Sequence, residues 1–342
     1  MKYPEFLKPG GTIGFIAPSF GCATEPYKTA FENALRVFKA MGYHVWLGPN
    51  VYESSGIGIS NTPEKCGQEL TEAYLGEECD VILSCGGGEL MCETISHTDW
   101  ERMKEAKPKL YMGYSDNTNA TFLLTTLLDT ASVYGSTAAT FGMEPWHPAL
   151  SMQWDIFTGK GRSVHGFDRF ELVSLKDENN PLAPYNCTEE TRVKAVPDPA
   201  GNTKLRGRLL GGCLDCLVNL CGTRFDRVKE FTERYKEDGI LWFLESCDLN
   251  VMSVRRALWE LREAGWFRNA TGFLIGRPMH FGEENFGCDM YEAVTGALSE
   301  LGVPILMDLD FGHLPPMFPI VCGALGEAEI RDGRFFMEMR YE

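Results

Sequence analysis

The stretch "YMGYSDNT" (residues 111–118) contains Ser115 at the point where a run of strand-forming residues gives way to a polar break. A helix-like run follows, so the serine is either a helix cap or a nucleophile held on a strand-to-helix turn. A serine becomes a nucleophile only when a base removes its proton and a third group orients that base. A nucleophile is therefore the better interpretation only if a suitable histidine and a suitable carboxylate occur elsewhere in the chain.

Two of the six histidines follow an apolar strand pattern. His313 lies in "LMDLDFGHLPPMFP", after a glycine and before a Pro-Pro break, and is the better candidate base. His280 follows another strand pattern and is the alternative base. A histidine at such a turn can also be purely structural, so this segment alone leaves the role of His313 open.

The candidate acid is Glu245, the first charged residue after the apolar run "GILWFL". A carboxylate at the end of a buried strand costs free energy unless it is paired, so the pattern predicts a partner for it. A solvated strand end is the other interpretation of this position. The alternative acids are Asp248, Asp308 and Asp310.

A glycine-rich segment, "SCGGGE" (84–89), follows the third strand pattern of the chain. Its three glycines let the backbone approach a ligand closely. It has neither the G-x-G-x-x-G spacing nor the Lys-Ser/Thr pair of a phosphate-binding loop. Beside the turn at Ser115 it supplies the N–H groups that an oxyanion hole needs. We expect the donors to be the backbone N–H of Asp116 and that of Gly87 or Gly88.

Strand and helix patterns alternate along the first half of the chain. Near-continuous apolar strands that alternate with amphipathic helices predict a parallel sheet covered on both faces. Functional groups of such a sheet gather at the carboxyl ends of its strands. The expected strands are 12–19, 43–48, 80–88 and 109–115, and the expected helices are 25–42, 61–76, 98–106 and 119–129.

A second domain is expected after a polar, turn-rich segment. We place the first, nucleophile-bearing domain at 1–165, an inter-domain connection at 166–204 and a C-terminal domain with the acid and base at 205–342. The C-terminal domain has a mixed α/β pattern, and a hairpin turn is expected at Arg331–Arg334. Its expected strands are 239–246, 272–278 and 304–313, and its expected helices are 251–265 and 290–301.

Composition limits the function classes. The 342 residues are 44% hydrophobic and 23% charged, which is typical of a globular protein with room for two cores. The net charge of −16 argues against nucleic acid and anionic membrane surfaces as partners, because phosphate groups require clustered Lys and Arg. The N-terminal stretch has no unbroken apolar region and no segment is long enough to span a bilayer. We therefore expect a cytoplasmic protein.

The twelve cysteines are scattered singly, as small buried residues of a reducing compartment would be. "CLDC" (Cys213 to Cys216) has the spacing of a metal or redox pair, but no second pair matches it and the spacing also suits one buried helical turn. We predict no metal. Cys85, at the end of a strand pattern, is an alternative nucleophile for a glutaminase-like site. A third possibility is a non-catalytic binding module that uses the glycine loop as an anion nest.

A set of short motifs keeps a fixed order along nearly the whole chain. The motifs are "IAPS" (16–19), "GGG" (86–88), "GYSD" (113–116), "LLGG" (209–212), "FLE" (243–245), "IGRP" (275–278) and "DFGH" (310–313). The order Ser…Glu…His is that of α/β-hydrolases, but "GYSDN" lacks the second glycine of their G-x-S-x-G motif. With these motifs the sequence resembles the LD-carboxypeptidase / microcin C self-immunity family of serine peptidases.

The resemblance implies a flavodoxin-like parallel-sheet N-terminal domain and a smaller, mixed α/β, swivelling C-terminal domain. It also implies a Ser–Glu–His triad, which falls on Ser115, Glu245 and His313, together with a homodimer and no cofactor or metal. The expected reaction is acyl transfer at an amide bond near a free carboxylate. The bond belongs either to an aminoacyl-nucleotide-like amide or to the L–D linkage of a cytosolic murein tetrapeptide.

Substrate contacts are assigned through the same resemblance. Members of the immunity type carry a Trp that stacks on adenine before the inter-domain connection. Here the segment 163–170 offers Phe167 and Phe170 instead. Glu89, which ends the glycine segment, is the third expected contact. The glycines are followed by "GELMCET", which differs from the polar segment usual in this family and leaves the choice of oxyanion donor open.

Overall fold

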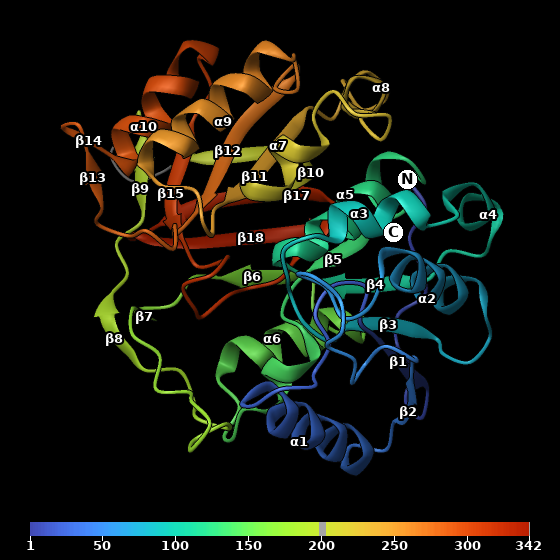
Figure 1. The fold of residues 1–342 in the computed structure, drawn as a ribbon. Coiled ribbons are helices and arrows are strands. Elements are labelled where there is room, and N and C mark those ends of the chain that lie inside the picture. The colour runs from blue at the N-terminus through green and yellow to red at the C-terminus, as the bar shows by residue number, and fades with distance from the viewer. Residues whose placement is uncertain (198–202, 342) are drawn as a thin grey trace. The chain divides into compact units, whose positions relative to one another are not determined.

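The computed structural model describes residues 1–197 and 203–341 of the chain. Packing divides the chain into two compact units (Figure 1). The first unit consists of Met1–Gly161 and Val173–Asn186, and the second consists of Arg162–Leu172 and Cys187–Glu342. Within the described ranges, every helix is too short or too polar to cross a membrane.

The first unit is built on a parallel sheet whose strands lie in the order β5-β4-β3-β1-β2. This is the strand order of the flavodoxin-like fold, so that prediction is confirmed. The central strands β3 and β4 are buried along their whole length, as their unbroken apolar sequences predict. The strands are β1 (Thr12–Ile16), β2 (His44–Leu47), β3 (Val81–Ser84), β4 (Leu110–Gly113) and β5 (Ser132–Tyr134).

Helices connect these strands and bury their apolar faces. The helix expected over 61–76 is α2 and begins at Pro63: the Thr62 side chain caps it by accepting a hydrogen bond from the Lys65 N–H, and Pro63 occupies the first turn. In α1 the Phe38 ring stacks on Trp154 with centroids 5.0 Å apart. The α-helices are α1 (Tyr27–Ala40), α2 (Pro63–Leu75), α3 (Met91–Thr94), α4 (Trp100–Glu105), α5 (Thr118–Thr126) and α6 (Pro148–Phe157); the 3-10 helices are η1 (Ile95–His97), η2 (Ser115–Asn117) and η3 (Ala138–Gly142).

The second unit has a mixed sheet in the order β6-β18-β17-β10-β11-β12-β15-β9. Strands β10, β11, β12 and β15 are parallel, and antiparallel strands flank them on both sides. The predicted hairpin joins β17 to β18, with Asp332 and Gly333 at φ 51° and 76°, the left-handed pair of a tight turn. The strands are β6 (Ser163–His165), β7 (Arg169–Glu171), β8 (Cys187–Glu190), β9 (Lys194–Val196), β10 (Lys204–Cys213), β11 (Ile240–Glu245), β12 (Ala270–Gly276), β13 (Glu284–Asn285), β14 (Cys288–Asp289), β15 (Ile305–Leu309), β16 (Ile320–Cys322), β17 (Leu325–Arg331) and β18 (Arg334–Arg340).

Helices α9 and α10 lie side by side against this sheet (Figure 1). Arg255 and Arg262 of α9 donate to backbone carbonyls of α10, which joins the two helices. Trp242 of β11 stacks on the buried Trp266, and Phe267 packs against Trp242, so this unit has an aromatic cluster in its core. The helices of this unit are α7 (Leu214–Leu220), α8 (Val228–Arg234), α9 (Val251–Glu263), α10 (Met290–Leu298) and the 3-10 helix η4 (Ser299–Leu301).

The segment 166–204, which we expected to be an inter-domain connection, contains regular structure. Strands β7 and β8 pair with each other, and β9 pairs with the edge strand β15. Residues 173–186 belong to the first unit, while the described residues on either side belong to the second. Residues 198–202 of the expected connection lie outside the described residues. The boundaries at 165 and 204 stay a prediction.

Candidate active site

Ser115 occupies a strained turn. It lies just after β4, is the first residue of η2, and has a φ of +63°, a left-handed conformation that is uncommon for serine. The N-cap positions of η2 and α5 are Tyr114 and Asn117, so Ser115 is not a helix cap. A strand that ends in a left-handed serine before a helix is the backbone arrangement that presents a nucleophile.

The glycine loop runs directly beside this serine. A Cβ added to Gly87 would lie 3.2 Å from Ser115 Oγ, and one added to Gly88 would lie 2.0 Å from Ser19 Oγ. Gly88 also has a φ of +152°, so only glycine fits there. Among the described residues, the N–H groups of Gly87 and Gly88 have no hydrogen-bond acceptor. They can therefore donate to a bound oxyanion.

Asn117 holds the glycine loop against the serine turn, a role that we did not predict. Its amide nitrogen donates to the carbonyls of Gly86 (2.7 Å) and Tyr114 (3.2 Å), and its amide oxygen accepts from the Tyr111 hydroxyl. The Asn117 side chain is fully buried. The only signal in the sequence was an asparagine two residues after the serine, which is also a common turn residue.

Asp116 acts as a buried hub through its side chain. The carboxylate accepts from Ser19 Oγ (2.5 Å), the Met91 N–H (2.9 Å) and the Asn119 amide (3.1 Å). Burial raises the pKa of Asp116 to about 6. The serine of "IAPS" therefore contributes by fixing Asp116, whose backbone N–H is an expected oxyanion donor. Glu89, at the other end of the loop, is exposed.

Cys85, the alternative nucleophile, is a poor one in this setting. It is fully buried, and its carbonyl oxygen accepts from the thiol of Cys22. Burial raises the pKa of the Cys85 thiol well above its ordinary value, which suppresses the reactive thiolate.

In the second unit, Glu245 and His313 form a hydrogen-bonded pair. Glu245 is the last residue of β11 and is 1% exposed, and its Oε2 lies 2.7 Å from Nδ1 of His313. The buried strand-end acid therefore has the partner that we predicted for it. With Nδ1–H donating to the carboxylate, Nε2 of the imidazole carries the lone pair of a base.

Two motif glycines make room for the Glu245 side chain. A Cβ on Gly276 of "IGRP" would lie 2.9 Å from Glu245 Cβ, and one on Gly312 of "DFGH" would lie 2.8 Å from Glu245 Oε2. Gly312 also has a φ of +103°. These two glycines are therefore required by the packing of Glu245, which the sequence alone did not reveal.

The alternative base and acids have other surroundings. His280 pairs with Glu283 at the surface (2.8 Å). Asp310 forms a buried ion pair with Arg277 (2.8 Å), and Asp308 accepts from the Tyr291 hydroxyl. These contacts are structural, and they leave the Glu245–His313 pair as the better candidate within its unit.

Comparison with known proteins places the chain in a family. The sequence model described as the LD-carboxypeptidase N-terminal domain matches residues 13–135, and that of the LD-carboxypeptidase C-terminal domain matches residues 206–327. The chain belongs to the LD-carboxypeptidase family. It is thus a member of a peptidase family, as the motifs indicated.

Curated relatives cover 89% or more of this LD-carboxypeptidase family chain. A putative carboxypeptidase of Vibrio cholerae is 24% identical over 100% of this chain and 99% of its own. The microcin C7 self-immunity protein of Escherichia coli is 23% identical over 93% of this chain and 90% of its own. The murein tetrapeptide carboxypeptidase of Pseudomonas aeruginosa is 22% identical over 89% of this chain and 88% of its own.

Solved structures share the two-domain LD-carboxypeptidase fold. An MccF-like protein from Bacillus anthracis has a TM-score of 0.83 at 20% identity, covering 99% of this chain and 100% of that one. The microcin C7 self-immunity protein in complex with aspartyl sulfamoyl adenosine has a TM-score of 0.80 at 20% identity, covering 99% of this chain and 98% of that one. The mixed α/β fold class is thereby confirmed.

The two phenylalanines expected to contact substrate differ in exposure in this member of the LD-carboxypeptidase family. Phe170 is 2% exposed and lies under the Arg277 guanidinium, 3.9 Å from its ring centroid. Phe167 is half-buried, and its N–H donates to Asp310 (2.7 Å). Asp310 and Arg277 therefore fix the segment that carries both rings. Phe167 retains more surface for a ligand than Phe170.

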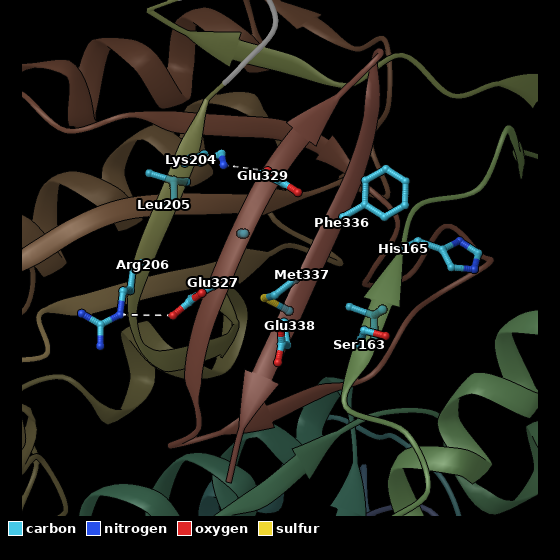
Figure 2. A pocket seen from close by; sticks show the side chains of 12 residues that line it. Ser163, His165, Lys204, Leu205, Arg206, Glu327, Glu329, Phe336, Met337 and Glu338 are labelled. Atoms are coloured by element: carbon cyan, nitrogen blue, oxygen red, sulfur yellow. Dashed lines mark ion pairs between the residues drawn. The ribbon is translucent and has the colours of Figure 1, made fainter.

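A hollow of about 640 Å³ in the second unit contains none of these LD-carboxypeptidase site residues. Figure 2 shows it over the antiparallel strands β6, β18, β17 and β10. Ion pairs between Lys204 and Glu329 (3.4 Å) and between Arg206 and Glu327 (3.5 Å) lie along its floor. These ion pairs make an open sheet face polar and contribute little to the stability of the fold.

A second buried carboxylate of the first unit, Glu69, is not part of the LD-carboxypeptidase site but has an unusual proton affinity. Its oxygens accept from the backbone N–H groups of Ala17 and Asn50, both at 2.9 Å, and tie together the loops after β1 and β2. Burial raises the pKa of Glu69 to about 7, against the effect of the two donors. The folded protein therefore binds a proton at Glu69 more tightly than the unfolded chain does.

This difference predicts a pH-dependent stability. A carboxyl whose pKa is raised by folding stabilises most below its unfolded pKa, and that contribution is lost as pH rises towards the folded value. As the pH rises from 4.5, the ordinary pKa of Glu, to about 7, the free energy of unfolding of the parent protein should fall by up to about 3 kcal/mol relative to that of Glu69→Gln. Urea denaturation of both proteins from pH 5 to 8 measures the difference. A difference that stays constant with pH would contradict the prediction.

Proposed function

We propose that the protein is a serine-type carboxypeptidase that uses Ser115 as nucleophile, His313 as base and Glu245 as the group that orients the base. The observation that carries the proposal is the part-buried hydrogen bond between Glu245 and Nδ1 of His313. It leaves Nε2 free of a proton, as a general base requires. The left-handed conformation of Ser115 beside the glycine loop supports the proposal from the other unit.

The reaction follows from these roles. Nε2 of His313 accepts the Ser115 hydroxyl proton as Oγ attacks the carbonyl carbon of the substrate amide. The backbone N–H of Asp116 and that of Gly87 or Gly88 donate to the oxyanion of the tetrahedral intermediate. The imidazolium then protonates the leaving amine, and an acyl-enzyme remains. Water, deprotonated by the same imidazole, releases the acid and restores Ser115.

This mechanism assigns one half of the site to each unit. The first unit supplies the nucleophile and the oxyanion donors, and the second supplies the base and the acid. Catalysis requires Ser115 Oγ and His313 Nε2 to come within about 2.6–3.2 Å of each other in the substrate complex. We propose that this meeting of the two half-sites is the reason for the two-domain architecture.

The substrate class is an amide next to a free carboxylate. Two relatives support it: one is named a microcin self-immunity protein and the other a murein tetrapeptide carboxypeptidase. A solved neighbour contains aspartyl sulfamoyl adenosine, an aminoacyl-nucleotide analogue. We propose an aminoacyl-nucleotide-like amide or the L–D bond of a murein tetrapeptide as substrate. Glu89, Phe167 and Phe170 are proposed to contact it, and Phe167 is the more exposed of the two rings.

Active-site labelling tests the nucleophile. A fluorophosphonate should label Ser115 stoichiometrically, because phosphonylation needs the activated hydroxyl, and Ser115→Ala should not be labelled at all. Peptide mapping by mass spectrometry after fluorophosphonate, and separately after iodoacetamide, locates the adducts. Stoichiometric alkylation of Cys85 with an unlabelled Ser115 would favour the glutaminase-like alternative.

The same preparation decides whether the protein turns over substrate. A panel of L–D murein tetrapeptides and aminoacyl-adenylate amides is assayed by chromatography, with Ser115→Ala as the matched control. Turnover in the parent protein alone supports the proposal and selects between the two substrate types. Tight binding of a panel member without turnover or labelling would favour the binding module.

A further inference from the structure

We propose that Cys213, Glu245 and His313 form a binding site for Zn²⁺, and that an ion bound there switches the active site off. The switching rests on the proposed function, whereas the binding does not. The Cys213 Sγ, a Glu245 carboxylate oxygen and an imidazole nitrogen of His313 all lie within 4.8 Å of one another. Thiolate, carboxylate and imidazole are the ligands that zinc prefers in proteins.

The fold brings these side chains together for a simple reason. Cys213 ends β10 and Glu245 ends β11, and the two residues are direct partners in the parallel pairing of those strands. Partners on neighbouring strands project from the same face of a sheet, so the thiol and the carboxylate stand side by side. His313 reaches them from the loop after β15 through its bond to Glu245.

The site is enclosed but not sealed. Cys213 and Glu245 are 2% and 1% exposed, while the His313 side chain is 12% exposed and provides the way in. Around zinc, donor atoms in a tetrahedral arrangement lie about 3.5 Å apart. Small shifts are therefore required: the thiol has to approach, while Glu245 Oε2 and His313 Nδ1, now 2.7 Å apart, have to separate. Three protein ligands leave a fourth position for water.

A supporting contact orients the thiol. Asp215 accepts from Cys213 Sγ (3.3 Å) and is itself fixed by the N–H groups of Cys247, Asp248 and Leu249. Such outer contacts hold a ligand in the geometry that a metal needs. Only the first cysteine of "CLDC" therefore belongs to the proposed zinc site. Cys213 faces Glu245 and His313, while Cys216 lies on the buried side of α7 and is not one of the three ligands.

Binding would inhibit through the histidine. Zn²⁺ would replace the thiol proton of Cys213, and that proton would leave to solvent. Zn²⁺ would also bond to Nδ1 of His313, in place of the proton that now forms the hydrogen bond to Glu245. The proton of the neutral imidazole then resides on Nε2. A protonated Nε2 cannot accept the proton of Ser115, so the proposed general base is lost without any change in the fold.

Titration of the full-length, metal-free protein tests the site. Zn²⁺ affinity is measured by calorimetry, and Co²⁺ is used as a spectroscopic probe of thiolate ligation. We expect a thiolate-to-cobalt absorption band in the parent protein. Cys213→Ser and His313→Ala should each lose about 10- to 100-fold or more in Zn²⁺ affinity, and Cys213→Ser should lose the band. Cys221→Ser, the matched control, removes a half-buried thiol just after α7 and should change neither.

The outcomes separate this inference from the proposed function. In the parent protein and Cys221→Ser, turnover should fall with the same Zn²⁺ midpoint as binding. Absence of the band, or equal Zn²⁺ affinity in Cys213→Ser and the parent protein, overturns the site even if the enzyme is active. Zn²⁺ binding that depends on Cys213, in a protein that never turns over the substrate panel, upholds the site and refutes the peptidase. Circular dichroism of each variant excludes misfolding as the cause.

Discussion

Ser115→Ala, His313→Ala and the double variant are expected to lower kcat/KM to one common residual level, on the order of 10⁴-fold or more below the parent protein. The reason is that the base has no proton to accept once the hydroxyl is gone, and the hydroxyl is not activated once the base is gone. The residual rate would come from the oxyanion donors and substrate binding. Steady-state kinetics on the best substrate of the panel measures all three losses.

The Glu245→Gln variant provides the graded comparison. It keeps the size of the side chain but replaces a charged acceptor by a neutral amide, so the histidine is less well oriented and its imidazolium less stabilised. We expect a smaller loss than for the other two residues. Losses of Ser115→Ala and His313→Ala that multiply in the double variant would show that the residues act independently, which the triad does not allow.

The strand-end positions of the site could be predicted from the sequence, because each follows an apolar run that is broken by a polar residue. Ser115 and Glu245 were found in this way: Ser115 lies two residues after β4, and Glu245 is the last residue of β11. The cost of burying an unpaired acid predicted a partner for Glu245, and the family resemblance implied that this partner is His313. The role of each residue came from the family motifs as well, not from local pattern alone.

The supporting contacts could not be predicted, because they join residues that are distant in the sequence. Asn117 bonds to Gly86, and Ser19 bonds to Asp116, across the edge of the sheet. The left-handed backbone of Ser115 has no sequence signal of its own, since serine rarely adopts it. The same limit applies to Cys213, whose neighbours Glu245 and His313 depend on strand register rather than on the spacing of "CLDC".

The segment 166–204 shows why a polar composition is a weak guide to structure. We expected a connection there because turn-forming residues dominate it. The short strands β7, β8 and β9 form nonetheless, since their backbone groups pair with each other or with β15. Phe170 within this segment is buried under Arg277, a contact that no periodicity could indicate. Tertiary pairing therefore overrides local preference where an edge strand is available.

Gly312→Ala is expected to lower kcat/KM by about 10²-fold without unfolding the protein. The new Cβ would lie 2.8 Å from Glu245 Oε2 and 3.0 Å from Cγ, so the carboxylate must move away from His313. A misplacement of about 1 Å in a catalytic group has a cost of this order. The loss should fall mainly on kcat, because the substrate-binding groups are untouched. Steady-state kinetics and thermal unfolding of the variant measure both effects.

The matched control is Gly265→Ala. Gly312 and Gly265 both have left-handed backbones, with φ values of +103° and +82°, so alanine strains each by about 1–2 kcal/mol. A Cβ on Gly265 meets no other atom within 4 Å, which leaves backbone strain as the only effect. Gly265→Ala should therefore lower the melting temperature while kcat stays near that of the parent protein. Equal kcat losses in the two variants would mean that backbone strain, and not displacement of Glu245, impairs the enzyme, and the proposed role of the Glu245–His313 pair would have to be withdrawn.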